Sequence, residues 1–230
     1  MKTIGLIGGM SWESSVVYYQ IINRRTKEIL GGSSSAQSLM YSVDFGRIAE
    51  LQHRGDWAEL KKLMIDAARR LERGGADLIV LCTNTMHMFA NEIAGSVEIP
   101  FLHIGDATGE AISEAGLKKV GLLGTKFTME GDFLKKRLAE RFKIETLTPG
   151  EEDREKVHSI IYDELVKGEI KDRSREIYLE VIEGLREKGA EGIVLGCTEI
   201  PLLVGSEDTD GVLFDTTRIH AEKAVAQAIN

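Results

Sequence analysis

The chain has 230 residues, of which 43% are hydrophobic, and its 37 acidic and 29 basic side chains give a formal net charge of −8. That length is enough for one large domain or two small ones, each with its own core. The acidic balance argues against a nucleic acid partner, and no apolar tract of about 18 residues could span a membrane. The first residues carry no secretion signal, and two cysteines cannot form a disulfide framework, so we expect a cytoplasmic protein.

Short aliphatic runs alternate with longer segments of helical period, which is typical of parallel strands joined by crossover helices. We predict strands at 3–7, 38–42, 78–82, 101–102, 120–123, 144–147 and 193–195, and a short one at 212–214. We predict helices at 14–30, 57–73, 106–115, 131–141, 154–167, 171–188 and 217–229. The order of these elements favours an α/β fold.

An internal repeat organises the chain into two halves. GGADLIVLCTNT, from Gly74, aligns without a gap on KGAEGIVLGCTE, from Lys188, and KTIGLIGG, from Lys2, aligns on KKVGLLGT, from Lys118. We therefore expect two pseudo-symmetric lobes, each a mainly parallel sheet flanked by helices, formed by residues 1–99 plus 213–230 and by 100–212. Because ligands of parallel sheets bind beyond the carboxyl ends of the strands, the active site is expected in the cleft between the lobes.

Thr83 and Cys197 occupy the same position in the two copies of the repeat. From opposite lobes they would approach a ligand from opposite sides, which suits inversion at a carbon, since that reaction needs two acid/base groups. Successive residues at a strand end point to opposite sides, so Cys82, one residue before Thr83, is expected to be a buried structural thiol.

Six segments carry a resemblance to a known family: GLIGGMSWESS at 5–15, CTNTMH at 82–87, FLHIGDATG at 101–109, GLLGTKFTM at 121–129, GCTEI at 196–200 and FDTTRIHA at 214–221. In these segments the chain resembles the cofactor-independent aspartate/glutamate racemases of the Asp/Glu/hydantoin racemase superfamily. Members usually have Cys before the Asn-Thr of the first motif, where this chain has Thr83. With Thr at this position, the chain resembles the subtype of the family that is specific for L-aspartate and L-glutamate.

The resemblance implies a racemase that uses no cofactor, with an amino acid (L-aspartate or L-glutamate) as its small-molecule partner. It implies that Cys197 is the base for the L-enantiomer and that Thr83 acts on the opposite face. A thiol needs help to ionise at neutral pH, and neighbouring backbone N–H groups or a helix N-terminus could provide it.

Further side chains are candidates for holding the substrate. Asn84, Thr85 and Thr198 lie beside the two acid/base positions and can donate hydrogen bonds to the α-carboxylate, although such residues also form turns and caps. The resemblance adds polar or pocket-wall residues: Met10, Ser11, Gln52, Thr125, Thr128 and Lys167.

Two other functions stay open at this point. One is a different reaction of the superfamily that needs a single cysteine, such as a decarboxylase or a dicarboxylate isomerase. The other is an amino acid sensor that has lost the chemistry. His87, His103 and His220 lack metal-ligand spacing and are expected to be structural, and no metal is expected. The sequence leaves a homodimer open as an assembly.

Overall fold

The computed structural model describes residues 1–230, which form two compact units. The first unit consists of Met1–Ile104 and His220–Asn230, and the second consists of Gly105–Ile219. Each unit is built on a four-stranded sheet whose strands are all parallel. The strand orders, β2-β1-β3-β4 and β6-β5-β7-β8, are the same order repeated. The α/β fold and the repeat are thus confirmed.

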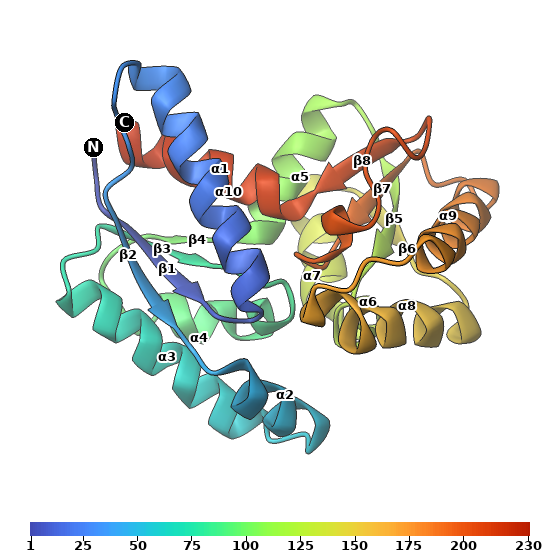
Figure 1. Ribbon diagram of the computed structural model, residues 1–230, viewed down its shortest axis with the longest axis horizontal. Coiled ribbons are helices and arrows are strands. Elements are labelled where there is room, and N and C mark those ends of the chain that lie inside the picture. Colours follow the sequence, from blue (N-terminus) through green and yellow to red (C-terminus); the bar gives the residue numbers. More distant parts are fainter. The chain divides into compact units, whose positions relative to one another are not determined.

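The first unit has its sheet in β1 (Ile4–Gly8), β2 (Ser38–Ser42), β3 (Leu78–Leu81) and β4 (Phe101–Leu102). Its helical elements are α1 (Trp12–Leu30), α2 (Phe45–His53), α3 (Trp57–Arg73), the 3-10 turn η1 (Thr85–Phe89), α4 (Ala90–Ala94) and most of α10 (Thr216–Ile229). Figure 1 shows α1 and α3 on opposite faces of this sheet.

Side chains of β1 and β3 alternate between two apolar clusters because successive strand residues point to opposite faces. Ile7, Ile79 and Leu81 pack with α2 and α3, whereas Leu6 and Val80 pack with α1 and α10. Both central strands are buried along their whole length. Neither face of the two central strands is therefore free to contact a ligand.

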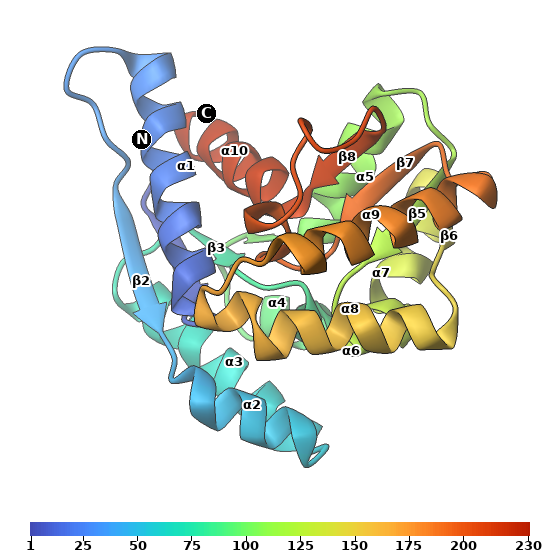
Figure 2. The same cartoon turned by 45° about the vertical axis from the view of Figure 1, so that its right-hand side comes forward.

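The second unit has its sheet in β5 (Lys119–Leu123), β6 (Glu145–Leu147), β7 (Gly192–Leu195) and β8 (Val212–Asp215). Its helical elements are α5 (Ile104–Glu114), α6 (Lys126–Glu130), α7 (Asp132–Arg137), the π turn η2 (Leu138–Phe142), α8 (Glu151–Asp163), the 3-10 turn η3 (Leu165–Lys167), α9 (Asp172–Glu187) and the 3-10 turn η4 (Ile200–Leu202). Helices α8 and α9 cover one face of the sheet, as Figure 2 shows, and α5 and α7 cover the other.

The structure corrects the expected lobe boundaries, 99/100 and 212/213. Strand β4 belongs to the first sheet because Ile79 and Val80 of β3 pair with it, and β8 belongs to the second sheet because it pairs with β7. Both boundaries therefore move toward the C-terminus, to 104/105 and 219/220. Helix α2 is an addition to the expected elements.

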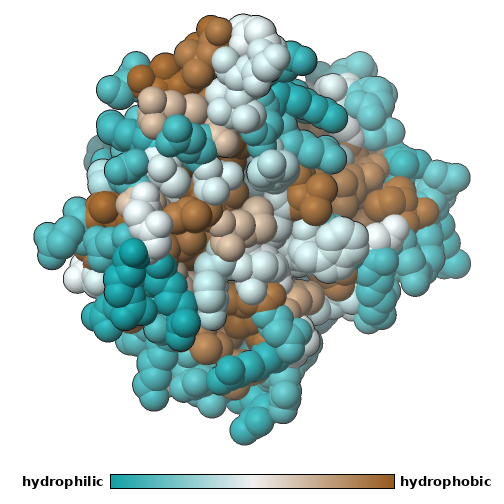
Figure 3. Space-filling model, turned by 60° about the vertical axis from the view of Figure 1, so that its left-hand side comes forward, coloured by the Kyte–Doolittle hydropathy of each residue, from teal (hydrophilic) through white to brown (hydrophobic).

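Polar and apolar side chains alternate on the surface of the first unit. Figure 3 brings the left-hand side of Figure 1 forward and shows brown apolar atoms between teal polar ones. Trp12, Val16 and Tyr19 of α1 and Met40 of β2 are exposed, and they line a shallow groove between the helix and the strand. None of the helices combines the length and the hydropathy needed to cross a bilayer.

Candidate active site

In the first unit, the chain turns sharply where β1 ends. Gly9 has a φ of +88°, and a Cβ there would lie 2.3 Å from the carbonyl oxygen of Val43, so only glycine fits. The Gly9 N–H donates to Ser15 Oγ (2.8 Å), whose hydroxyl donates to the Ser11 carbonyl (2.9 Å). Ser11 Oγ caps α1 by accepting from the Ser14 N–H at 3.3 Å. These bonds fix the loop that carries Met10 and Ser11.

The residues after β3 divide between core and site. Cys82 is completely buried in the cluster that packs on α1 and α10, and this burial raises the pKa of its thiol. Cys82 is thus buried in the core, as expected, and its purely structural role stays a prediction. Thr83 follows with 8% of its surface exposed. Its backbone N–H donates to the Leu81 carbonyl (2.9 Å), and its own carbonyl accepts from His87 Nδ1 (2.7 Å).

The other candidates of the first unit are buried as well. Asn84 and Thr85 directly follow Thr83 and open the 3-10 turn η1. Met10 packs in the apolar cluster on the α2 and α3 side, and Gln52 is a buried polar residue of α2. Met10 and Thr83 therefore follow the ends of adjacent strands, β1 and β3, at the carboxyl edge of the first sheet.

In the second unit, the equivalent loop after β5 carries Thr125 and Thr128. Thr125 Oγ1 caps α6 by accepting from the Thr128 N–H at 3.3 Å, and the two hydroxyl oxygens lie 3.2 Å apart. Both side chains are buried. The contacts of these two hydroxyls are those of a helix cap. Binding of a substrate by the same hydroxyls would be a second role in addition to capping.

Two glycines let the ends of β5 and β7 approach closely. A Cβ on Gly124 would lie 2.8 Å from the Gly196 carbonyl oxygen, and a Cβ on Gly196 would lie 2.7 Å from the Leu123 carbonyl oxygen. The Gly196 N–H donates to the same Leu123 carbonyl at 2.6 Å. This close pairing determines where the chain places the next residue, Cys197.

Cys197 is 7% exposed and donates its thiol hydrogen to Glu199 Oε2 at 3.0 Å. Thr198 Oγ1 donates to the same oxygen at 2.9 Å. Burial, then the negative charge of Glu199 and the bond to it, raise the pKa of the Cys197 thiol. Backbone N–H groups of Thr198 and Glu199 oppose this rise because they stabilise the thiolate. The resting sulfur is thus a thiol whose proton already points at a base.

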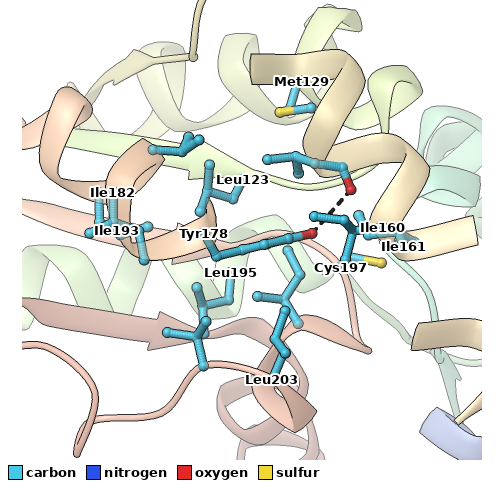
Figure 4. Close-up of a cluster of buried hydrophobic side chains, with 14 of the residues drawn as sticks. Leu123, Met129, Ile160, Ile161, Tyr178, Ile182, Ile193, Leu195, Cys197 and Leu203 are labelled. Carbon is cyan, nitrogen blue, oxygen red and sulfur yellow. Dashed lines mark hydrogen bonds between the residues drawn. The ribbon is translucent and has the colours of Figure 1, made fainter. Parts of the chain in front are cut away.

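The surroundings of Cys197 are apolar on the side of the core. Figure 4 shows it beside Ile160 and Ile161 of α8 and near Tyr178 of α9, whose hydroxyl donates to the Val157 carbonyl (3.1 Å). Burial, followed by the electrostatic effect of the nearby acidic groups Cys197 and Glu199, raises the pKa of Tyr178, so this phenol stays neutral. Water is therefore excluded from one side of the sulfur.

Sequence reasoning missed Glu199, a carboxylate that is only 2% exposed. The repeat marks its position, because Glu199 stands where the first copy has Thr85, but the repeat does not show that this carboxylate is buried beside the thiol. Lys167 differs from the other candidates in being exposed. It lies in the turn η3 beside the carboxylate of Glu169, while Leu165 of the same turn packs in the cluster around Cys197.

Comparison with known proteins decides the family. The model of the family described as Asp/Glu/Hydantoin racemase matches residues 7–224. The chain belongs to this family.

Two solved structures resemble this chain along its whole length. A Yersinia pestis protein assigned as an Asp/Glu racemase is 49% identical with a TM-score of 0.92, and both chains are covered completely. An aspartate racemase homologue from Pyrococcus horikoshii is 37% identical with a TM-score of 0.86, again with complete coverage. Among curated sequences, the broad specificity amino-acid racemase RacX of Bacillus subtilis is 30% identical over 138 residues, which are 59% of this chain and 60% of RacX.

Proposed function

We propose that the protein is an amino acid racemase that inverts Cα of aspartate or glutamate by a two-base proton transfer without a cofactor. One observation supports this most strongly: the Cys197 thiol is bonded to a buried carboxylate at the carboxyl end of β7. A thiol that is hydrogen-bonded to a proton acceptor can give up its proton to that acceptor and become a thiolate. Membership in the racemase family supports the same reaction class.

For the L-enantiomer, Cys197 passes its proton to Glu199 and the resulting thiolate removes the Cα proton. Because the backbone N–H groups of Thr198 and Glu199 stabilise the thiolate, this transfer does not leave an isolated buried charge. Protonation of Glu199 also removes the negative charge that raises the Cys197 pKa. The carboxylate therefore drives ionisation of the thiol in the same step in which it accepts the proton.

The carbanion receives its new proton on the opposite face from the Thr83 hydroxyl. Thr83 is then an alkoxide that regains a proton from water, and Glu199 returns its proton to water. The enzyme therefore ends the cycle in its starting protonation state. A hydroxyl is a poorer base than a thiolate, so Thr83 serves better as the acid for the L-enantiomer than as the base for the D-enantiomer. We propose that the two sheet ends serve one substrate molecule in this way.

Several polar groups would bind the substrate. Asn84, Thr85 and Thr198 are the proposed donors to the α-carboxylate, where hydrogen bonds stabilise the negative charge that develops on deprotonation. Thr125, Thr128 and Ser11 add donors, Met10 forms a wall, and Gln52 and Lys167 are proposed to read the side-chain carboxylate. We also propose that the enzyme is cytoplasmic and assembles as a homodimer, which light scattering after size-exclusion chromatography would measure.

Deuterium exchange tests the proposed function directly. The protein is incubated with each L-amino acid in deuterated buffer, and both α-deuteration and D-product are scored. We expect both for L-aspartate or L-glutamate. No exchange with either would contradict racemisation and favour a sensor, whereas carbon dioxide release from a malonate would identify a decarboxylase that uses Cys197 as proton donor.

A further inference from the structure

Three buried histidines cluster in the first unit next to the Thr83 loop. The ring centroid of His87 lies 4.7 Å from that of His103 and 5.8 Å from that of His220. His87 itself is 2% exposed. The proposed proton transfers use none of these rings, so their hydrogen bonds need another explanation.

The hydrogen bonds of His87 assign its tautomer. The Ile104 backbone N–H can only donate, and it points at His87 Nε2 at 3.1 Å, so Nε2 carries no hydrogen. The ring is therefore neutral with its proton on Nδ1, and that N–H donates to the Thr83 carbonyl at 2.7 Å. Since the Thr83 N–H is bonded to Leu81, both backbone polar groups of Thr83 are held.

The other end of this link is also fixed. Ile104 begins α5 and is the last residue before the chain leaves the first unit, and His220 is the first residue after it returns. The Leu102 carbonyl can only accept, so His220 Nε2–H donates to it (3.0 Å) and Nδ1 accepts from the Tyr18 hydroxyl (2.9 Å). Burial lowers the pKa of His220 to about 4, which keeps this ring neutral as well.

We propose that His87 is a positioning residue for Thr83, with one neutral imidazole tying the Thr83 carbonyl to the backbone at which the chain leaves the first unit. The inference rests on the proposed function, because the aim of the Thr83 hydroxyl matters only if that hydroxyl transfers a proton. A misplacement of about 1 Å at such a group lowers turnover by about 10²-fold.

Two substitutions separate the two bonds of the ring. In His87→Gln, the amide reaches the place of Nε2 and can still accept from Ile104, but the donor to Thr83 is lost. In His87→Asn, the shorter amide keeps a donor near the place of Nδ1 and the acceptor for Ile104 is lost. The matched control is His220→Gln, which replaces a buried histidine of the same cluster that makes no hydrogen bond to the Thr83 loop.

The measurement compares two fates of L-substrate in deuterated buffer. Return to α-deuterated L-substrate needs only Cys197, whereas D-product needs Thr83 as well. We expect the ratio of exchange to inversion to rise by about tenfold or more in His87→Gln and to stay near the wild-type value in His87→Asn and His220→Gln. An unchanged ratio in folded His87→Gln, or an equal rise in His220→Gln, would overturn the inference.

The wild-type protein supplies a second test that does not depend on the stability of the variants. Nitrogen-15 NMR of the imidazoles shows which ring nitrogen carries the hydrogen, and we expect Nδ1–H for His87. A hydrogen on Nε2 would overturn the inference even if His87→Gln does not fold. Wild type that neither exchanges nor inverts aspartate or glutamate overturns the proposed function together with this inference, whereas active wild type with an unchanged ratio in His87→Gln overturns this inference alone.

Discussion

The ends of β3 and β7 occupy the same place in two sheets of the same order, yet their chemistry differs. After β7, the thiol of Cys197 donates to the carboxylate of Glu199. After β3, the hydroxyl-bearing Thr83 is held through its carbonyl by the neutral ring of His87, and the position that matches Glu199 is Thr85. One end carries a thiol with its own base, and the other carries a weak acid on a fixed backbone. A repeated scaffold can therefore carry unequal chemistry at two equivalent strand ends.

The largest expected effect is on the β7 side. Cys197→Ser should lower turnover of L-substrate by about 10³-fold or more, because a serine hydroxyl cannot supply the base at neutral pH. Cys82→Ser is the matched control, since it makes the same change at the other buried cysteine. Steady-state assays on folded protein, checked by circular dichroism, measure both variants, and near wild-type turnover by Cys197→Ser would remove this thiol from the mechanism.

Removal of the β7 carboxylate should have the next largest effect. Glu199→Gln loses the proton acceptor of the thiol, and we expect kcat to fall by about 10²-fold. It also loses the negative charge that raises the Cys197 pKa, so that pKa should fall. The pH profile for alkylation of Cys197 by iodoacetamide should then shift to lower pH. A shift to higher pH, or unchanged kcat, would contradict the role assigned to Glu199.

Thr83→Cys should make the two ends more alike by placing a thiol at both, although Thr85 still stands where the β7 end has Glu199. Free enantiomers have an equilibrium constant of one, so kcat/KM must be equal in both directions, and asymmetry can appear only in kcat, KM and exchange. We expect kcat for D-substrate to rise by about tenfold, because a thiolate replaces a hydroxyl as its base. Kinetics in both directions measure this. Equal kcat, KM and exchange rates for the two enantiomers in the wild type would contradict the predicted asymmetry.

The smallest effect on turnover is expected at the core thiol. Cys82→Ala deletes a sulfur that packs between α1 and α10, so the free energy of unfolding should drop by about 1 kcal/mol. Turnover at the assay temperature should stay within about twofold of wild type. Denaturant unfolding and activity assays together test this, and lost activity in a folded protein would place Cys82 in the site.

Buried strands were the most predictable part of this fold. Strands β3 and β7 are buried at every residue, so their sequences LIVL and GIVL contrast with the polar segments around them. Helix α2 went unpredicted because it is short and buries only Ile48, Leu51 and Gln52, which leaves a weak periodic signal.

The site was predictable where the repeat pointed to it and not beyond. Thr83 and Cys197 follow from an alignment of the chain with itself. Glu199 and His87 could not be recovered in the same way, because their roles depend on hydrogen bonds formed only in the folded chain. An acidic residue is expected at the surface by default, and nothing local to the sequence shows that this one is buried beside a thiol.

The first unit is interrupted by the whole of the second and is completed only by α10. Ala221, Ala224 and Val225 fill one face of its sheet, and the Lys2 N–H donates to the Ala228 carbonyl at 2.8 Å. On a ribosome, every residue of the second unit is synthesised before these alanines emerge. The part that is made first must therefore wait with one side of its sheet covered by α1 alone, and it is the later part that can finish folding first.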